Sequence, residues 1–307
     1  MTDVSIDYKP FSWTNQVPFI ALVNAVQRLE GTPRAFDPLS MEEWLRLPGR
    51  DPEENCLLAF AGDTLLGYIV VNQERPIKRV VLEGGVLPAH RRKGVGTRLF
   101  DWALERGRQA NAAIAHAAAL EDDTEQIGFL ESRGFILVRH HEQMRWNGEC
   151  VPEPTLSSGF VFRPFRFGDE VGLTEVQNAA FSTQWGFSPN TVEQVAHMVN
   201  MGRSDPEGVV LLIADDEVAG YCWTQTAGEA PQVMGSILMI GVHPKHQGKG
   251  LGRAVLSYGI RSLLQRGIRV VELTVDRENT AARTLYTSFG FVKIGGQKWY
   301  ETTLIAG

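Results

Sequence analysis

The stretch HQGKGLGRAV, residues 246–255, places three glycines and two cations close together. Such a loop is suited to an anion, because glycines let a ligand approach the backbone and Lys249 and Arg253 add positive charge. It is not a Walker A loop, since no Ser or Thr follows Lys249 and no glycine lies five residues before Gly248. It also lacks the dinucleotide fingerprint, which requires a third small residue at Val255. A glycine-rich turn without a ligand is the alternative interpretation.

A second loop of the same type indicates an internal repeat. VLPAHRRKGVG at 86–96 aligns with VHPKHQGKGLG at 242–252, with an offset of 242 − 86 = 156. Three other pairs occur in the same order: YKPF with FRPF (162 − 8 = 154), the Gly-Tyr ends of two strand pairs (220 − 67 = 153), and SRGF with SFGF (288 − 132 = 156). Four matches at a nearly constant offset predict two copies of one domain. We therefore expect domains at residues 1–147 and 160–307, with a linker at 148–159 rich in Pro, Gly and Ser.

The composition limits the classes of function. Of the 307 residues, 43% are hydrophobic and 21% charged, which is typical of a soluble globular protein. The net charge of −6 argues against nucleic acid and anionic membranes as partners, so a basic loop in this acidic chain favours a small anion. The three cysteines lack disulfide or metal-ligand spacing, so no metal is expected. Without a signal pattern or a long apolar run, the cytoplasm is the expected location.

The elements that must position the loops follow from the hydrophobic periodicity. The predicted order in each copy is βααβββαβαββ, an α/β domain with a central mixed sheet flanked by helices. In the second copy the expected segments are a strand at 159–165, helices at 169–181 and 189–200, two strands within 208–226, a strand at 235–244, a helix at about 251–266, a strand at 269–276, a helix at 279–290, and two strands at 291–296 and 298–304.

In this order each glycine loop joins a central strand to a helix. The backbone N–H groups at the start of a helix have no partner within the helix, and the helix N-terminus carries a partial positive charge. Such a strand-to-helix turn is suited to a pyrophosphate.

Two motifs together resemble the GCN5-related N-acetyltransferases. That family has Gln/Arg-x-x-Gly-x-Gly/Ala after a strand ending in Val-x-Pro, and both loops fit, at 242–252 and at 86–96. Its second motif, Asn-x-x-Ala-x-x-Leu-Tyr followed by Gly-Phe, appears as NTAARTLYTSFGF at 279–291. The resemblance covers nearly the whole chain and implies acetyl-coenzyme A as the cofactor.

The resemblance also implies roles for individual residues. Tyr286 would protonate the leaving thiolate, for which a phenol is a suitable acid, whereas the alternative is a core aromatic on an amphipathic helix. The residues implied in cofactor binding are Ile240, Gly241, Val242, Gln247, Gly248, Lys249, Gly250, Leu251, Gly252, Arg253 and Asn279 in the second copy, and Gly85, Val86, Arg91, Arg92, Lys93, Gly94, Val95 and Gly96 in the first.

The first copy departs from the second motif. Counting back from Gly134-Phe135, the tyrosine position is Leu130 and the asparagine position is Asp123. Leucine cannot donate a proton, and the carboxylate of Asp123 would bring negative charge toward an anionic cofactor. We predict that the first copy binds the cofactor at most, and that the second copy transfers the acetyl group.

Within the family, a tandem pair with a working second copy resembles the mycothiol synthases. The likeness is closest in YCWTQT (221–226) and NAAFSTQWGFSP (178–189), which makes Trp185, Phe187 and Trp223 candidates for the acceptor pocket. Ordinary core packing is the alternative for all three residues, including Trp223 on its strand.

One departure concerns the base. That subgroup has a glutamate eight residues before the proline of Val-x-Pro, and here 244 − 8 gives Ser236. By resemblance Thr274 faces the substrate, so Glu272, or Glu229, could reach the amine through water.

The predicted function is an acetyl-coenzyme A dependent N-acetyltransferase that acts on a primary amine of a small molecule. Two alternatives remain open at this point. One is a non-catalytic acyl-coenzyme A sensor or scaffold, which Leu130 and Ser236 favour. The other is an enzyme that acetylates peptide or protein amino groups.

Overall fold

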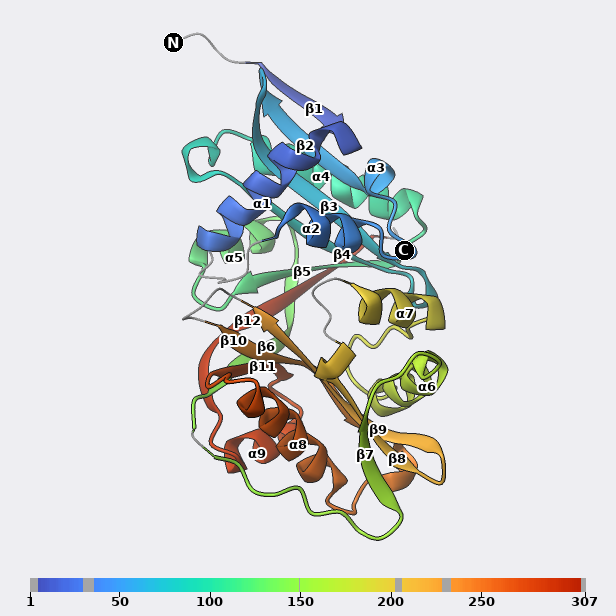
Figure 1. Cartoon of the computed structure of the whole chain (residues 1–307). Helices are drawn as coiled ribbons and strands as arrows, with labels where there is room; N and C mark the ends of the chain where they lie inside the picture. The colour runs from blue at the N-terminus through green and yellow to red at the C-terminus, as the bar shows by residue number, and fades with distance from the viewer. Residues whose placement is uncertain (1–4, 30–35, 149, 202–205, 228–232, 305–307) are drawn as a thin grey trace. The chain divides into compact units, whose positions relative to one another are not determined.

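The chain folds into two compact units that do not coincide with the two sequence copies at their ends. The computed structural model describes residues 5–29, 36–148, 150–201, 206–227 and 233–304. Unit 1 contains Met1–Arg139 and Gln297–Gly307, and unit 2 contains His140–Gly296. Figure 1 shows the elements of both.

Unit 1 is a sheet with helices on both faces. Its strands lie in the order β1-β2-β3-β4-β5-β12. Only β4 and β5 are parallel neighbours, since the other pairs are antiparallel. The elements are β1 (Ile6–Pro10), α1 (Gln16–Leu29), α2 (Pro38–Leu45), α3 (Pro52–Asn55), β2 (Cys56–Ala61), β3 (Thr64–Glu74), β4 (Arg79–Val86), α4 (Val95–Gln109), β5 (Ile114–Leu120), α5 (Thr124–Ser132) and the second part of β12 (Val292–Thr303).

Unit 2 repeats this plan. Its strands lie in the order β6-β11-β10-β9-β8-β7, and β10 and β11 are the parallel pair. The elements are β6 (Ile136–Trp146), most of which lies in unit 2, followed by β7 (Phe160–Pro164), α6 (Glu170–Phe181), α7 (Val192–Asn200), β8 (Val209–Ala214), β9 (Glu217–Ala227), β10 (Met234–Val242), α8 (Leu251–Gln265), β11 (Val271–Asp276) and α9 (Thr280–Ser288). Short 3-10 turns are η1 (Trp13–Asn15), η2 (Arg75–Ile77), η3 (Pro88–His90), η4 (Pro206–Gly208) and η5 (Pro244–His246).

Each unit is completed by a strand from the other half of the chain. Residues 297–303 of β12 pair antiparallel with β5 in unit 1, and residues 141–146 of β6 pair antiparallel with β11 in unit 2. Residues 140–147 therefore fold with the second copy and 297–304 with the first, unlike the sequence ranges 1–147 and 160–307. A strand belongs to the unit whose open sheet edge it fills, because its backbone groups need partners there.

The end of the chain also differs from the predicted pattern. The two closing strands expected at 291–296 and 298–304 are one continuous strand, β12. Neither Gly295 nor Gly296 takes up a positive φ, so the glycine pair makes no turn. Each copy therefore contributes a single closing strand.

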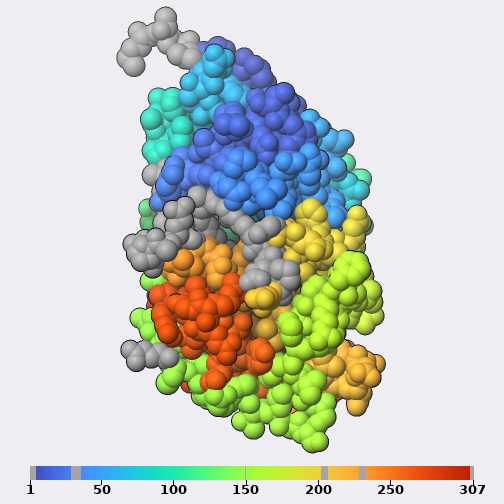
Figure 2. Space-filling model, in the orientation of Figure 1, coloured from blue at the N-terminus to red at the C-terminus, as the bar shows by residue number. Residues whose placement is uncertain are grey.

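Alternating side chains build two cores in unit 2. Along β9, Cys222 packs with residues of α8 and α9, whereas Tyr221 and Trp223 pack with residues of α6 and α7. The two helix pairs therefore cover opposite faces of the sheet, as expected for a strand whose side chains alternate. The outer surfaces of α8 and α9, in orange to red, are visible in Figure 2.

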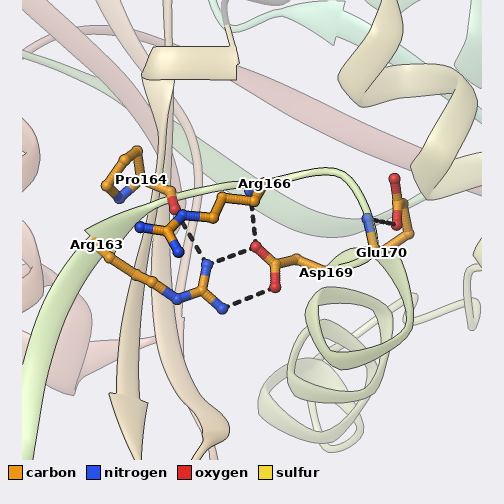
Figure 3. A network of polar contacts seen from close by, with 6 residues as sticks. Arg163, Pro164, Arg166, Asp169 and Glu170 are labelled. Carbon is orange, nitrogen blue, oxygen red and sulfur yellow. Dashed lines mark hydrogen bonds and ion pairs between the residues drawn. The ribbon is translucent and has the colours of Figure 1, made fainter.

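Polar contacts fix the start of the two helices on one face. The Arg163 guanidinium binds both carboxylate oxygens of Asp169, at 2.6 and 2.7 Å, and the Arg166 N–H also donates to Asp169 (2.7 Å), as Figure 3 shows. The N-cap of α7 is Thr191, not the preceding Asn190. The Asn190 N–H donates to the Asn178 side chain instead, at 2.9 Å, so this residue ties the α6–α7 loop to α6.

Candidate functional site

The parallel strands of unit 2 separate at their carboxyl ends. β10 and β11 pair at Gly235–Val271, Ser236–Glu272 and Ile237–Leu273, but β10 continues to Val242 and β11 to Asp276. Past Ile237, β10 pairs with β9 only. Unit 1 has the same opening, because the β4–β5 pairing ends at Leu82 and Ala117. The backbone groups on the open side need other partners, so an extended ligand can take the place of a strand.

A β-bulge lies at the mouth of this opening in unit 2. The pairing of β10 with β9 shifts between Ile237 and Met239, and Leu238 is exposed. As a result Ile237 and Ile240, three residues apart, both pack against the core of α8 and α9. In unit 1, β4 pairs with β3 in continuous register. A bulge changes the direction of backbone groups and side chains, and here it does so in one copy only.

The glycine loops follow these strands, and the same contact closes both of them. The Gln247 side chain donates to the carbonyl oxygen of Val242 (3.0 Å), and the Arg91 Nε donates to the carbonyl oxygen of Val86 (3.1 Å). A long donor at this motif position therefore holds the loop to the end of its strand. Sequence analysis assigned both residues to the cofactor and missed this role.

The glycines leave open space at the start of the helix. Gly248 and Gly250 have φ of 78° and 76°, and Arg92 takes the place of Gly248 in unit 1 with a φ of 57°. A Cβ at Gly250 would have no neighbour within 4 Å, and one at Gly252 would meet Leu285 only at 3.8 Å. Gly250 is the N-cap of α8 and has no side chain that could cap the first turn. The glycines therefore leave room beside the start of α8, which the approach of an anion to a helix N-terminus requires.

The cations of the loops make local contacts. Arg253 donates to the Ser288 hydroxyl (3.0 Å), and its guanidinium lies 4.8 Å from the Phe289 ring. Lys249 lies 5.9 Å from the Phe160 ring, and Lys93 donates to the Ala89 carbonyl oxygen (2.9 Å). The side chains of Leu251 and Val95 are buried, so only their backbone can take part in a loop site.

Unit 1 contains a cavity of about 370 Å³ at its loop. Among the residues that line it are six predicted cofactor positions, Gly85, Val86, Arg91, Arg92, Gly94 and Gly96. Leu130 of α5 and Phe129 line its apolar part, and Asp123 lies at the same cavity. The predicted loop residues therefore border a real concave site.

Tyr286 and Leu130 take the same place in the two units. The N–H of Phe291 donates to the carbonyl oxygen of Tyr286 (3.1 Å), and the N–H of Phe135 donates to that of Leu130 (3.2 Å). Both side chains are buried. Burial, and then the nearby Cys222 thiol, raise the pKa of Tyr286 above its usual value. The phenol is therefore kept in its protonated form, which a proton donor needs.

Asn279 and Asp123 are also equivalent, and both are helix N-caps. The Asn279 side chain accepts from the Ala282 N–H (3.1 Å), and Asp123 accepts from the Gln126 N–H (2.9 Å). Capping explains why either residue type serves here, and sequence reasoning missed it. The Asn279 amide also donates to Gln184 (3.4 Å), next to the predicted pocket residue Trp185.

The predicted acceptor residues differ in burial. Trp185 is half-buried, and its ring lies edge-on to the ring of His141 at 6.1 Å. Phe187 is also half-buried in the α6–α7 loop. Trp223 is 3% exposed in the core with α6 and α7, which favours the packing alternative.

Ser236, Glu272 and Thr274 share a face of the sheet, opposite the core of α8 and α9. The Glu272 carboxylate accepts hydrogen bonds from Gln143 (2.9 Å) and from Arg145, at 2.8 and 2.6 Å. Both partners belong to β6, so the sequence repeat gave no signal for them. Glu229 lies outside the described residues.

Two kinds of feature are absent from the described residues. None of the helices within the described ranges is long and apolar enough to cross a membrane. In the same part of the chain no three His, Cys, Asp or Glu side chains are grouped as metal ligands would be.

The chain is similar to known proteins over most of its length. The model of the Acetyltransferase (GNAT) family matches residues 21–135 and again 171–291. The mycothiol acetyltransferase of Kocuria rhizophila is 29% identical, covering 97% of this chain and 98% of that protein. The mycothiol acetyltransferase of Streptomyces avermitilis is 31% identical, covering 92% and 90%.

Solved structures show the same fold. A GCN5-related N-acetyltransferase from Sphaerobacter thermophilus superposes with a TM-score of 0.73 at 26% identity, covering 98% of this chain and 96% of that one. A tandem GNAT protein from the clavulanic acid biosynthesis pathway gives 0.75 at 15% identity, covering 99% and 100%. With the family model matching both copies, the chain belongs to the GNAT acetyltransferase family.

Proposed function

We propose that unit 2 transfers the acetyl group of acetyl-coenzyme A to a primary amine of a small molecule, and that unit 1 binds the same cofactor without transferring its acetyl group. The observation that carries this division is the shared backbone position of Tyr286 and Leu130. A phenol can give a proton to a leaving thiolate, whereas a leucine cannot.

The donor would lie in the opening between β10 and β11. Its pantetheine arm would pair with the backbone of Ile240–Val242, which has a strand partner on one side only. Its pyrophosphate would bind the N–H groups between Gln247 and Arg253, where Gly250 and Gly252 leave space.

The reaction needs little beyond positioning and one acid. The amine nitrogen forms a bond to the thioester carbonyl carbon and gives up a proton, and the carbon–sulfur bond breaks. The leaving sulfur takes a proton from the Tyr286 hydroxyl and departs as the thiol of coenzyme A. Because burial raises the pKa of Tyr286, the hydroxyl is protonated throughout the neutral range.

The acceptor is proposed from the relatives and from the polar face of unit 2. Proteins named mycothiol acetyltransferase cover nearly the whole chain, which supports a small-molecule amine of related type. The face formed by Ser236, Glu272 and Thr274 offers hydrogen-bonding groups to a polar acceptor. Ser236 replaces the glutamate of that subgroup, so an amine of lower pKa, such as an α-amino group, would react more readily at pH 7 than a lysine-like amine.

A second candidate function is an acyl-coenzyme A sensor in which neither unit turns over. The cavity of unit 1 favours it there, because the loop residues border a site with no tyrosine at the position of Leu130. The two candidates differ in one property, which is the release of coenzyme A in response to an amine.

The test is a screen of primary amines for coenzyme A release by the full chain at several pH values. We expect release that depends on the amine and increases with pH, because the free-amine fraction increases. A panel without a single active amine would support the sensor. Equal rates for α-amino and lysine-like amines at every pH would contradict the acceptor class.

A further inference from the structure

Three side chains form a row across unit 2 where its parallel strands begin to separate. Ser236 of β10 is in register with Glu272 of β11, and Glu272 is in register with Arg145 of β6. Their neighbours along each strand, such as Val271 and Met144, pack into the core of α8 and α9. Since side chains alternate along a strand, the three polar residues lie on the opposite face.

The carboxylate in the middle of this row is held from one side. Gln143 donates to one oxygen at 2.9 Å, and the Arg145 guanidinium donates twice to the other at 2.8 and 2.6 Å. An ionised carboxylate has about four lone-pair directions, so about one is left for a further donor. The side chain of Glu272 is 11% exposed, while that of Arg145 is 42% exposed.

Burying the carboxylate of the Glu272–Arg145 pair costs free energy of desolvation, and side-chain packing alone does not explain why the pair is present. Removing a carboxylate from water is expensive, and a buried ion pair gains little over apolar side chains of similar size. Such a pair is therefore weak evidence for a purely structural role. Its neighbour across β10 is Ser236, where the mycothiol synthases have their base.

We propose that Glu272 is the acceptor-side base of this chain, with its carboxylate on β11 instead of at position 236 on β10, and that Gln143 and Arg145 are the positioning residues that hold it. The inference rests on the proposed function of unit 2. A proton of the acceptor ammonium passes to the free lone pair of Glu272 and then to solvent. The neutral amine then attacks the thioester carbonyl carbon, the carbon–sulfur bond breaks, and Tyr286 supplies the proton that leaves with the sulfur. The nitrogen loses its second proton as the amide forms, and a proton returns through solvent to the Tyr286 phenolate.

Unit 1 supplies an internal reference for this assignment. The residues at the places of Ser236, Glu272 and Arg145 are Val81, His116 and Glu301. His116 Nε2 lies 2.7 Å from the Glu301 carboxylate, so a cross-strand pair is kept, but the carboxylate is on the outer strand. Only in unit 2 does a carboxylate stand beside the strand that carries the bulge.

The experiment uses the full chain and transfers the carboxylate from position 272 on β11 to position 236 on β10. Glu272→Ser should lower kcat for coenzyme A release by about 10²-fold or more. The double variant Ser236→Glu with Glu272→Ser should recover at least about tenfold of that loss, because one carboxylate again faces the amine. The KM for acetyl-coenzyme A should not change in either variant.

The positioning role has its own readout. Without the guanidinium in Arg145→Met, the Glu272 carboxylate loses two of its three hydrogen bonds, so kcat should fall while the KM for acetyl-coenzyme A stays unchanged. Arg145→Lys keeps a charged donor and should restore part of kcat. Glu301→Gln is the matched control, because it breaks the equivalent pair in unit 1 and should leave kcat unchanged.

Three outcomes would overturn the inference: wild-type kcat in Glu272→Ser, no recovery in the folded double variant, or wild-type kcat in Arg145→Met. Circular dichroism checks that each variant folds. If the wild type itself releases no coenzyme A with any amine, the proposed function fails first, and this failure is distinct from the other three.

Discussion

Units 1 and 2 have the same strand-loop-helix geometry and differ in the side chains that chemistry needs. In both, a long donor closes the glycine loop onto its strand, through Arg91 in one and Gln247 in the other. In both, the second motif begins with a helix cap, Asp123 or Asn279. Only unit 2 adds the phenol, at Tyr286. The loop closure and the helix caps occur in both units, so their presence alone does not indicate catalysis.

The β-bulge is a second difference between the units. Val81 and Ser236 hold equivalent sheet positions with an offset of 236 − 81 = 155, whereas Val86 and Val242 differ by 242 − 86 = 156. The change of one residue is the bulge at Leu238. One inserted residue therefore distinguishes the strand of the predicted catalytic unit from its counterpart.

The largest expected effect tests the exchange of strands between the copies. Trp146 is 2% exposed in the core of unit 2 and donates to the Phe289 carbonyl oxygen (3.0 Å), and Tyr300 is 2% exposed in the core of unit 1. Trp146→Ala and Tyr300→Ala should each lower the free energy of unfolding by roughly 3–5 kcal/mol. Hydrogen exchange should locate the loss for Trp146→Ala in 160–296, and for Tyr300→Ala in 5–135.

The opposite distribution would contradict the exchange. If Trp146→Ala destabilised only residues 5–135, then β6 would belong to the first copy, as the sequence ranges suggest. For each variant, the unaffected unit is the internal control.

A smaller effect concerns the two loops. Gly252→Ala should weaken the binding of coenzyme A to unit 2 by about tenfold, since a Cβ there enters the open space in front of the loop. Gly96→Ala is the matched change in unit 1 and should weaken only the binding there. Calorimetry on the full chain measures both. Val at Gly250 would be a poorer test, because the positive φ of that residue would add backbone strain.

Identical binding curves for the wild type and both glycine variants would show that the loops do not hold the pyrophosphate. A loss in Gly252→Ala alone would limit cofactor binding to unit 2.

The smallest expected effect concerns the ion pair at the start of the first helix, which unit 2 has and unit 1 lacks. The hydrogen bonds from Arg163 lower the pKa of Asp169. Unit 1 lacks this ion pair at the equivalent positions, which are Lys9 in place of Arg163 and Asn15 in place of Asp169. Because this pair is partly exposed, Asp169→Asn should lower the free energy of unfolding by roughly 1 kcal/mol at pH 7. The pKa of Asp169 is lower in the folded state than in the unfolded state. The ion pair therefore stabilises the fold fully above the unfolded pKa, near 4, and this stabilisation is lost as the pH falls through the folded-state pKa. Urea unfolding at pH 7 and pH 2 measures this, and an equal loss at both values would contradict the ion-pair account.

Local patterns predicted much of the fold and some of the site. The glycine loops and the helix at 251–265 depend on neighbouring residues and were predicted from sequence. The repeat offset correctly indicated two similar units. Its failure at residues 140–147 and 297–304 has a physical cause, since β6 and β12 are both closing strands and the pattern of a strand does not specify which sheet edge it fills.

The partners of Glu272 could not be predicted for the same reason. Gln143 and Arg145 lie about 130 residues earlier and reach Glu272 only because β6 pairs with β11. A periodic pattern gives the face of each strand but not its neighbour. For Trp223 the motif and the strand position indicate different places. The motif suggested an acceptor pocket, whereas the position on β9 places the side chain in the core with α6 and α7.

The central claim is that acetyl transfer occurs in unit 2 alone, and the direct measurement is coenzyme A release by Tyr286→Phe beside Leu130→Met. We predict that Tyr286→Phe lowers turnover by roughly 10²-fold with unchanged affinity for acetyl-coenzyme A, and that Leu130→Met turns over like the wild type. Since burial raises the pKa of Tyr286, the wild type should keep its activity as the pH increases through 9. Equal losses in the two folded variants, or full turnover in Tyr286→Phe, would contradict the account.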